Sequence, residues 1–200
     1  MHGEGPAPTL TAVRRSRPGR VALDVDGRPW RIVPDEVVVR CGLRPGLELE
    51  RPLLRDLRRE LRRSEALATA VRTVSRRDIS AVRLRQRLDA RGIASQEAEA
   101  AVETLSAAGV VDDDRLARSR ARALAERGWG DAAVAARLEQ EGLPPQAVTG
   151  ALAEIPAERE RAAELRARTP DRRALWRLLA RRGFAPETIE DVVGPLDDPH

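Results

Sequence analysis

The amino-acid sequence predicts an all-α protein built from tandem helical repeats, preceded by a small β-hairpin region. Aromatic residues make up only 2% of the 200 residues, with no Tyr and one Phe, so the core must consist of aliphatic side chains. Such a core favours helices, because strands are usually richer in aromatic and β-branched residues. A short apolar pattern that ends in glycine also occurs three times, which indicates repeated helical units.

The N-terminal fifty residues are expected to differ from the rest of the chain. Residues 1–19 are rich in Pro, Gly and Arg without periodicity, which predicts a disordered tail. Residues 20–50 form the predicted extension, in which apolar side chains alternate with polar ones on both sides of Asp26-Gly27. This pattern predicts a β-hairpin with a tight turn. Because Pro29 cannot donate to a ladder, its strand either lies at an edge or starts late. The next segment also fits a strand at Val37-Val38-Val39, but a short helix capped by Asp35 and ended by Gly42 is favoured.

Residues 51–200 are predicted to form a helical repeat domain, with repeats at approximately 66–107, 108–157 and 158–197. The recurring pattern has apolar residues at i and i+4, which mark one buried helix face, and then a glycine and another apolar residue. Its three copies occupy residues 84–93, 134–143 and 175–184. The glycines at 92, 142 and 183, spaced 50 and 41 residues apart, should adopt the left-handed conformation that ends a helix. Each of these glycines ends a helix, and the expected N-caps of the three helices are Ser80, Gly130 and Asp171.

Charge alternates along the helical region. Residues 72–91 contain seven Arg and two acidic residues, a net charge of +5, whereas residues 92–114 contain six acidic residues and no Arg. The overall excess of 36 basic over 32 acidic residues is weak evidence for nucleic-acid binding, because every basic residue is Arg, as a GC-rich genome would impose. Two interpretations remain open: helices of opposite charge pack together, or the basic helices align into a stripe that faces a polyanion.

No residue pattern indicates catalysis, a cofactor or a metal site. The two histidines are His2 and His200, at opposite ends of the chain, and Cys41 has no histidine near it in the sequence to activate it. Asp112, Asp113 and Asp114 stand where helix capping favours acids. No phosphate-binding loop, dinucleotide fingerprint or zinc spacing occurs, so we expect a binding protein rather than an enzyme. Without a signal peptide or an apolar run of about 20 residues, a cytoplasmic location is expected.

The repeated unit resembles the bacterial RecX family of recombinase regulators. The resemblance rests on Arg-Gly-Ile, Glu-Gly-Leu and Arg-Gly-Phe at the repeat ends, on the segment 107–120 with its three aspartates, and on Arg127-Gly128-Trp129-Gly130 before the second repeat. It covers about residues 66–196, and the hairpin region resembles an extension of some members. Leu116 stands where the family usually has an aromatic residue, and Arg83 where it commonly has Glu, which puts one capping or ion-pair contact in doubt.

The resemblance implies three-helix repeats in an elongated, curved arrangement. It also implies a monomer that binds the RecA protein filament on single-stranded DNA, with direct DNA contact as an addition, and that inhibits recombinase and ATPase activity in DNA repair, DNA recombination and the SOS response. The arginines assigned to this partner or to DNA are Arg76, Arg77, Arg118, Arg122, Arg172, Arg173, Arg181 and Arg182. A stand-alone DNA-binding regulator and a helical scaffold are the alternatives.

Overall fold

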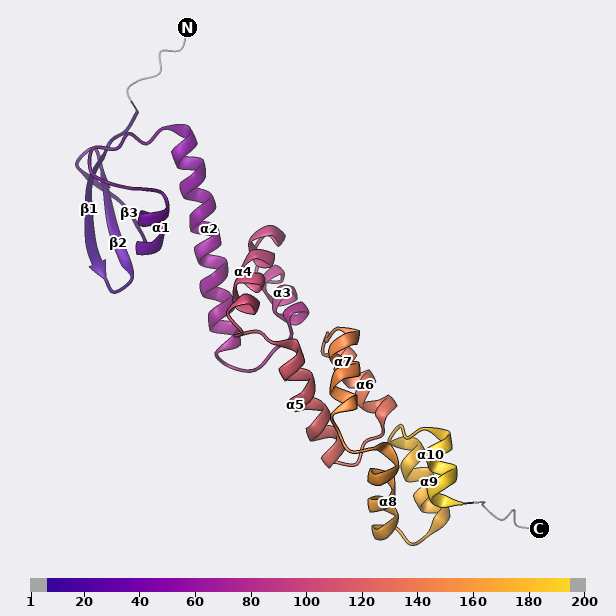
Figure 1. Ribbon diagram of the computed structural model, residues 1–200. Helices are drawn as coiled ribbons and strands as arrows, with labels where there is room; N and C mark the ends of the chain where they lie inside the picture. Colours follow the sequence, from indigo (N-terminus) through magenta and orange to yellow (C-terminus); the bar gives the residue numbers. More distant parts are fainter. Residues whose placement is uncertain (1–6, 195–200) are drawn as a thin grey trace. The chain divides into compact units, whose positions relative to one another are not determined.

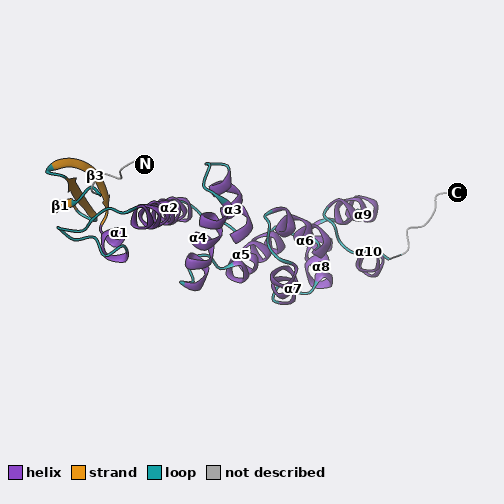
Figure 2. Ribbon diagram, turned by 90° about the horizontal axis from the view of Figure 1, so that it is seen from above, coloured by secondary structure: helices purple, strands orange, loops and turns teal. Residues whose placement is uncertain are grey.

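The computed structural model describes residues 7–194, and this range contains ten helices and three strands. All strands lie near the N-terminus, and helices follow from residue 35 onward (Figures 1 and 2). The prediction of a mostly helical chain with a small β region at its start is therefore confirmed. The chain divides into two compact units, one holding residues up to Thr73 together with Leu88–Thr104, the other Val74–Arg87 and the residues from Leu105 on.

The β region is an antiparallel sheet in the order β1-β2-β3, built from β1 (Leu10–Arg17), β2 (Arg20–Val25) and β3 (Arg28–Pro34). The predicted hairpin is β2–β3, and both of its turn residues have positive φ, 50° at Asp26 and 76° at Gly27, as a type I′ turn requires. β3 is an edge strand, so Pro29 interrupts no ladder on its outer side.

Residues 10–17 were predicted as part of a disordered tail, and that prediction is wrong. They form β1, which pairs with β2 along its length. Leu10 is fully buried, and the Arg14 guanidinium forms an ion pair with the Asp24 carboxylate of β2. The arginines of this strand make its sequence look like a polar tail. Pairing with β2, rather than the local pattern, decides its structure. Residues 1–6 of the predicted tail lie outside the described range.

The core of the first unit lies between the sheet and two helices, α1 (Asp35–Arg40) and α2 (Arg51–Val74). Leu23 of β2, Val37 of α1 and Leu57 of α2 are all buried in it. The first half of α2 thus shares a core with the sheet (Figure 1), while the predicted domain boundary between residues 50 and 51 stays a prediction. Gly42, with φ of 59°, ends α1 as expected, but the N-cap is Pro34 and not Asp35.

Small residues form the buried face of the second half of α2. Ala66, Ala70, Thr69 and Thr73 are buried, whereas Val71 is 46% exposed. Arg62 of α2 donates to the carboxylate of Glu97 in α4 (Ser95–Ala107) at 2.8 Å, and this hydrogen bond lowers the pKa of Glu97. The ion pair joins the two helices, but its exposed arginine limits what it adds to stability.

Six helices lie in the second unit beyond Leu105. They are α5 (Asp113–Glu126), α6 (Asp131–Gln140), α7 (Pro145–Ala153), α8 (Glu158–Arg168), α9 (Arg172–Arg181) and α10 (Pro186–Val193). One apolar core joins α5, α6 and α7, with Val134 and Leu138 fully buried. A second core joins α8, α9 and α10 around Leu175 and Leu179. The apolar i, i+4 pairs of the sequence therefore mark the buried faces, as predicted.

The same turn closes the first helix of three helix pairs, α3 (Ala81–Asp89) with α4, α6 with α7, and α9 with α10. Gly92, Gly142 and Gly183 have φ of 77°, 77° and 71°. The N–H of the residue after each glycine donates to the carbonyl of Leu88, Leu138 or Leu179, at 3.2 Å in each case. This is the Schellman arrangement, and it confirms the predicted left-handed glycine at each position.

Two of these turns pack against the start of an earlier helix. The carbonyl of Glu141, just before Gly142, accepts a hydrogen bond of 2.6 Å from the Ser80 hydroxyl at the start of α3. The carbonyl of Arg182, just before Gly183, accepts one of 2.8 Å from the Gly130 N–H at the start of α6. A Cβ on Gly130 would lie 2.2 Å from the Gly183 oxygen, so only glycine fits there.

Replacing Gly142 with Val is expected to destabilise the fold by about 1 kcal/mol or more, because the residue has φ of +77° and its Cβ would press on Ser80 and Val82 at 3.3 Å. Thermal unfolding measures this as a lower Tm. The matched control is Gly150→Ala inside α7, where an added Cβ meets nothing within 4 Å and should raise stability by up to about 1 kcal/mol. Equal melting temperatures for the Gly142→Val variant and the parent chain would contradict the assignment.

Candidate partner-binding surface

The arginines predicted to meet a partner fall into two groups. Arg76, Arg77, Arg122, Arg173 and Arg181 are exposed and form no ion pair with any described residue. Arg118 on α5 is also exposed, but its guanidinium lies 3.7 Å from the Glu154 carboxylate after α7. At that distance and exposure the pair contributes little to stability and leaves the guanidinium available. These six side chains are placed where a partner can reach them.

Arg172 and Arg182 have structural contacts. The Arg172 Nε donates to the Val193 carbonyl at the end of α10 at 3.0 Å. The half-buried Arg182 donates to the Arg127 carbonyl at 3.0 Å and to the Gly128 carbonyl at 3.3 Å, just beyond the end of α5. Arginines at these positions satisfy carbonyls that a helix end leaves unpaired. Sequence reasoning grouped them with the surface arginines because it does not show which way a side chain points.

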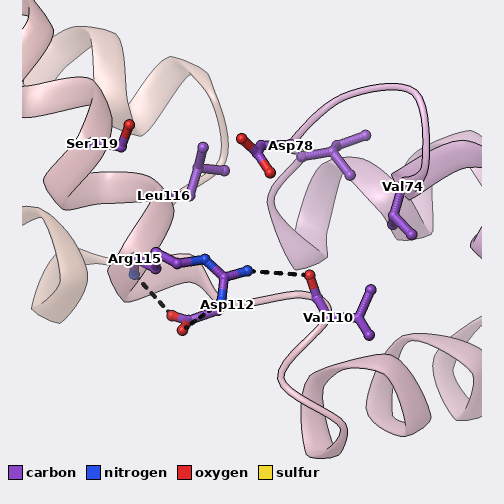
Figure 3. Close-up of a pocket in the computed structure, with 8 residues that line it drawn as sticks. Val74, Asp78, Val110, Asp112, Arg115, Leu116 and Ser119 are labelled. Atoms are coloured by element: carbon purple, nitrogen blue, oxygen red, sulfur yellow. Dashed lines mark hydrogen bonds and ion pairs between the residues drawn. The ribbon is translucent and has the colours of Figure 1, made fainter.

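Arg76 and Arg77 belong to the loop after α2, and Val74 and Asp78 on either side of them in the sequence line a small pocket of the second unit, which Figure 3 shows. Its apolar wall is formed by Val74, Ile79, Val110 and Leu116, and its polar residues are Asp78, Asp112, Arg115 and Ser119. The Arg115 side chain bends back to the Val110 carbonyl and the Asp112 carboxylate, as Figure 3 shows. With a volume of about 160 Å³, the pocket accommodates one side chain rather than a cofactor.

Two of the three aspartates at the start of α5 act as helix caps. The Asp112 carboxylate accepts the Arg115 N–H at 2.8 Å, and the Asp113 carboxylate accepts the Ala81 N–H at the start of α3 at 3.0 Å. Partial burial raises the pKa of Asp113, against the lowering effect of that hydrogen bond. Among the residues that the structure describes, no three His, Cys, Asp or Glu side chains lie close enough to hold a metal ion.

Cys41 and Trp129 have local structural surroundings. Cys41 is half-buried against the core of the first unit, and burial, together with the charges of Glu60 and Asp56, raises the pKa of its thiol. This makes the cysteine a poor nucleophile. Trp129 packs against the core of α5, α6 and α7, and the Arg137 guanidinium lies 3.5 Å above its ring centroid. Trp129 therefore serves packing.

The buried Arg161 of α8 escaped the sequence analysis. It is 4% exposed, and its guanidinium donates to the carbonyls of Pro156 and Trp129 and to the Asp131 carboxylate. Glu158, one turn earlier, accepts the Asp131 N–H at 2.7 Å and the Ala185 N–H at 3.1 Å. These two side chains link the starts of α6, α8 and α10. In the sequence, Arg161 is one arginine in a helix rich in charged residues, so nothing there distinguishes it from its exposed neighbours.

This chain resembles known proteins in sequence and in fold. No protein-family model matches it. The regulatory protein RecX of Xanthomonas campestris pv. campestris (strain B100) is 38% identical over 124 residues, which cover 57% of this chain and 76% of that protein. The regulatory protein RecX of Stenotrophomonas maltophilia (strain R551-3) is 36% identical over an alignment of the same length and coverage. The chain belongs to the RecX family.

Solved RecX structures share the fold. A crystal structure of a regulatory protein RecX superposes with a TM-score of 0.79 and 19% identity, covering 92% of this chain and 99% of that one. RecX from Lactobacillus salivarius superposes with a TM-score of 0.60 and 15% identity, over 66% of this chain and 94% of that one. In this RecX-family chain, no helix within residues 7–194 has the length and apolarity needed to span a bilayer.

Replacing Arg161 with Met is expected to lower the free energy of unfolding by roughly 3 kcal/mol, because it leaves two carbonyls and the Asp131 carboxylate without their donor. Urea denaturation measures the loss. Arg159→Met on the same helix is the control, because Arg159 pairs with Asp191 at 3.5 Å and both side chains are exposed. The control should cost less than about 1 kcal/mol. Similar losses for both variants would contradict the role given to Arg161.

The raised pKa of Asp113 predicts a pH-dependent contribution to stability. Because the folded-state pKa lies above its ordinary value of 3.8, the native state holds this proton more tightly than the unfolded chain does. The contribution is complete below pH 3.8 and is lost as the pH rises through the folded pKa. Asp113→Asn keeps the acceptor for Ala81 without titrating, so its stability relative to the parent should increase over that window. Urea denaturation midpoints measured from pH 3 to 7 test this, and the exposed neighbour variant Asp114→Asn is the control. A difference in midpoint between Asp113→Asn and the parent that does not change with pH would contradict the prediction.

Proposed function

We propose that this chain binds the RecA recombinase filament on single-stranded DNA and inhibits its recombinase and ATPase activity. Its action is steric and electrostatic, without catalysis by the chain itself. The observation that carries the proposal is membership of the RecX family, through relatives that bear the name regulatory protein and are matched over 76% of their length. We name RecA as the partner because the repeat ends and the aspartate-rich junction resemble that family.

The exposed arginines support a binding surface of this kind. Arg76, Arg77, Arg122, Arg173 and Arg181 are exposed and form no ion pair with a described residue, so their charge is available to acidic protein surfaces or DNA phosphates, although Asp171 lies near Arg173. Arg118 joins them through its weak pair with Glu154. Arg172 and Arg182 are left out of the proposed contact set, because their guanidinium groups bind helix-end carbonyls.

We further propose that the helices form three repeats: the second half of α2 through α4, α5–α7 and α8–α10. Two observations support this: the same Schellman turn at Gly92, Gly142 and Gly183, and the packing of the last two turns against Ser80 and Gly130. Repeats of equal geometry suit a partner that is itself a lattice of identical subunits, because each repeat can meet a successive subunit.

The test is RecA ATPase on single-stranded DNA with the full chain at sub-stoichiometric amounts. We expect inhibition, and we expect the double variant Arg118→Glu with Arg122→Glu to inhibit at least tenfold less. Arg168→Glu, an exposed arginine of α8 outside the proposed set, is the control for charge and should inhibit like the parent. If the chain neither inhibits RecA ATPase nor co-sediments with RecA filaments, the proposal is wrong.

The same experiment separates the alternatives. If inhibition occurs only where the chain saturates naked DNA, and falls steeply with salt in parallel with that binding, the chain is a stand-alone DNA-binding regulator. If neither RecA nor DNA binds, a helical scaffold remains.

A further inference from the structure

The outward face of α9 carries a tryptophan among three arginines. Arg173, Trp176, Arg177 and Arg181 are exposed, Trp176 with 44% of its surface accessible, whereas Leu175 and Leu179 on the opposite face are buried. We call these four residues the α9 face. At 3.6 residues per turn they fall on one side of the helix, and Arg173, Arg177 and Arg181 repeat about every 6 Å along it. The exposed Ala180, one turn after Trp176, leaves the space beside the indole open.

The charge of the α9 face is only partly offset within the described chain: the charges of Arg177 and Arg173 contribute to the lowered pKa of Asp171, but no carboxylate lies within ion-pair distance of these arginines. α9 contains no Asp or Glu. Asp171, which precedes it, uses its carboxylate to accept the Ala174 N–H at 2.9 Å, and this bond lowers the pKa of Asp171. Arg173, Arg177 and Arg181 form no ion pair with described residues. By contrast, Arg118 and Arg120 of α5 and Arg159 of α8 each have a carboxylate within 3.7 Å.

The Trp176 ring is likewise uncovered. Trp129 lies under the Arg137 guanidinium at 3.5 Å, and Arg31 lies 5.9 Å from the Trp30 centroid. In the described part of the chain no cationic side chain stacks on Trp176, although Arg173 and Arg177 flank it. An accessible indole flanked by unpaired guanidinium groups has a large apolar area that solvent does not stabilise.

We propose that the α9 face binds single-stranded nucleic acid, with a base stacked on Trp176 and backbone phosphates on Arg173, Arg177 and Arg181. Single strands are recognised by this combination of aromatic platforms and a cationic track, because every base has a π-face and every nucleotide a phosphate. Acidic side chains would pair with the arginines but offer no base to stack on the indole. The inference rests on the proposed function, since the strand would be the one that the RecA filament carries.

The experiment measures binding of the full chain to a fluorescein-labelled 12-nucleotide oligothymidylate by anisotropy at low salt, without RecA. Trp176→Ala should weaken binding roughly fivefold or more. Trp176→Phe, which keeps an aromatic face, should recover most of the loss. Arg177→Gln should weaken binding and reduce the slope of log K against log salt by about 0.7, the value for one phosphate contact on a single strand. Trp30→Ala, the other exposed tryptophan, is the control and should bind like the parent.

An abasic oligomer of the same length separates stacking from phosphate binding. Trp176→Ala should bind it within twofold of the parent, and Arg177→Gln should still bind it more weakly. Equal binding of oligothymidylate by Trp176→Ala and the parent would overturn the proposal, as would displacement by polyglutamate as effective as by unlabelled oligothymidylate. Because RecA is absent, failure of RecA inhibition leaves this result intact, and failure here leaves RecA inhibition to be judged separately.

Discussion

The buried guanidinium of Arg161 is the interaction on which most of the second unit depends. It satisfies the Trp129 and Pro156 carbonyls and the Asp131 carboxylate at a place where the chain passes between helices and leaves backbone groups without partners. Glu158 completes the junction by accepting N–H groups at the starts of α6 and α10. A buried charge is tolerated only with such a set of partners, so the junction fixes three helix starts at once.

Some arginines of this protein form ion pairs between helices, and others face solvent. The alternation of charge along the sequence does not distinguish the two kinds. Arg118, Arg120 and Arg159 of the basic helices pair with Glu154, Glu141 and Asp191, so helices of opposite sign do pack together. These exposed pairs add little stability, but they remove arginines from the surface that a polyanion would meet. Arg76, Arg77, Arg122 and the arginines of the α9 face are exposed and are not removed in this way. Net charge over the whole chain therefore says little about binding, whereas the partner of each arginine says much.

Local pattern predicted the helical region well because the helices end by local chemistry. A glycine with positive φ, a Schellman hydrogen bond and a capping aspartate such as Asp112 or Asp171 all act within a few residues. The i, i+4 leucines were buried as predicted for the same reason, since helical periodicity is itself local. The prediction failed at β1, where strand pairing across residues 10–25 outweighs a sequence that looks like a tail. It also failed for the α1 cap, where Pro34 takes the position assigned to Asp35.

The sequence by itself determined the helical class, the hairpin turn at Asp26-Gly27, the three glycine turns and the family. Tertiary structure alone decided which arginines serve the fold and which face solvent. Arg172, Arg173, Arg181 and Arg182 occur within eleven residues, yet two bind helix-end carbonyls and two are unpaired on the surface. The physical reason is that an arginine side chain is long enough to reach carbonyls of distant segments, so its partner depends on which helix ends lie nearby. That information, like the exposure of Trp176, exists only once the helices are packed.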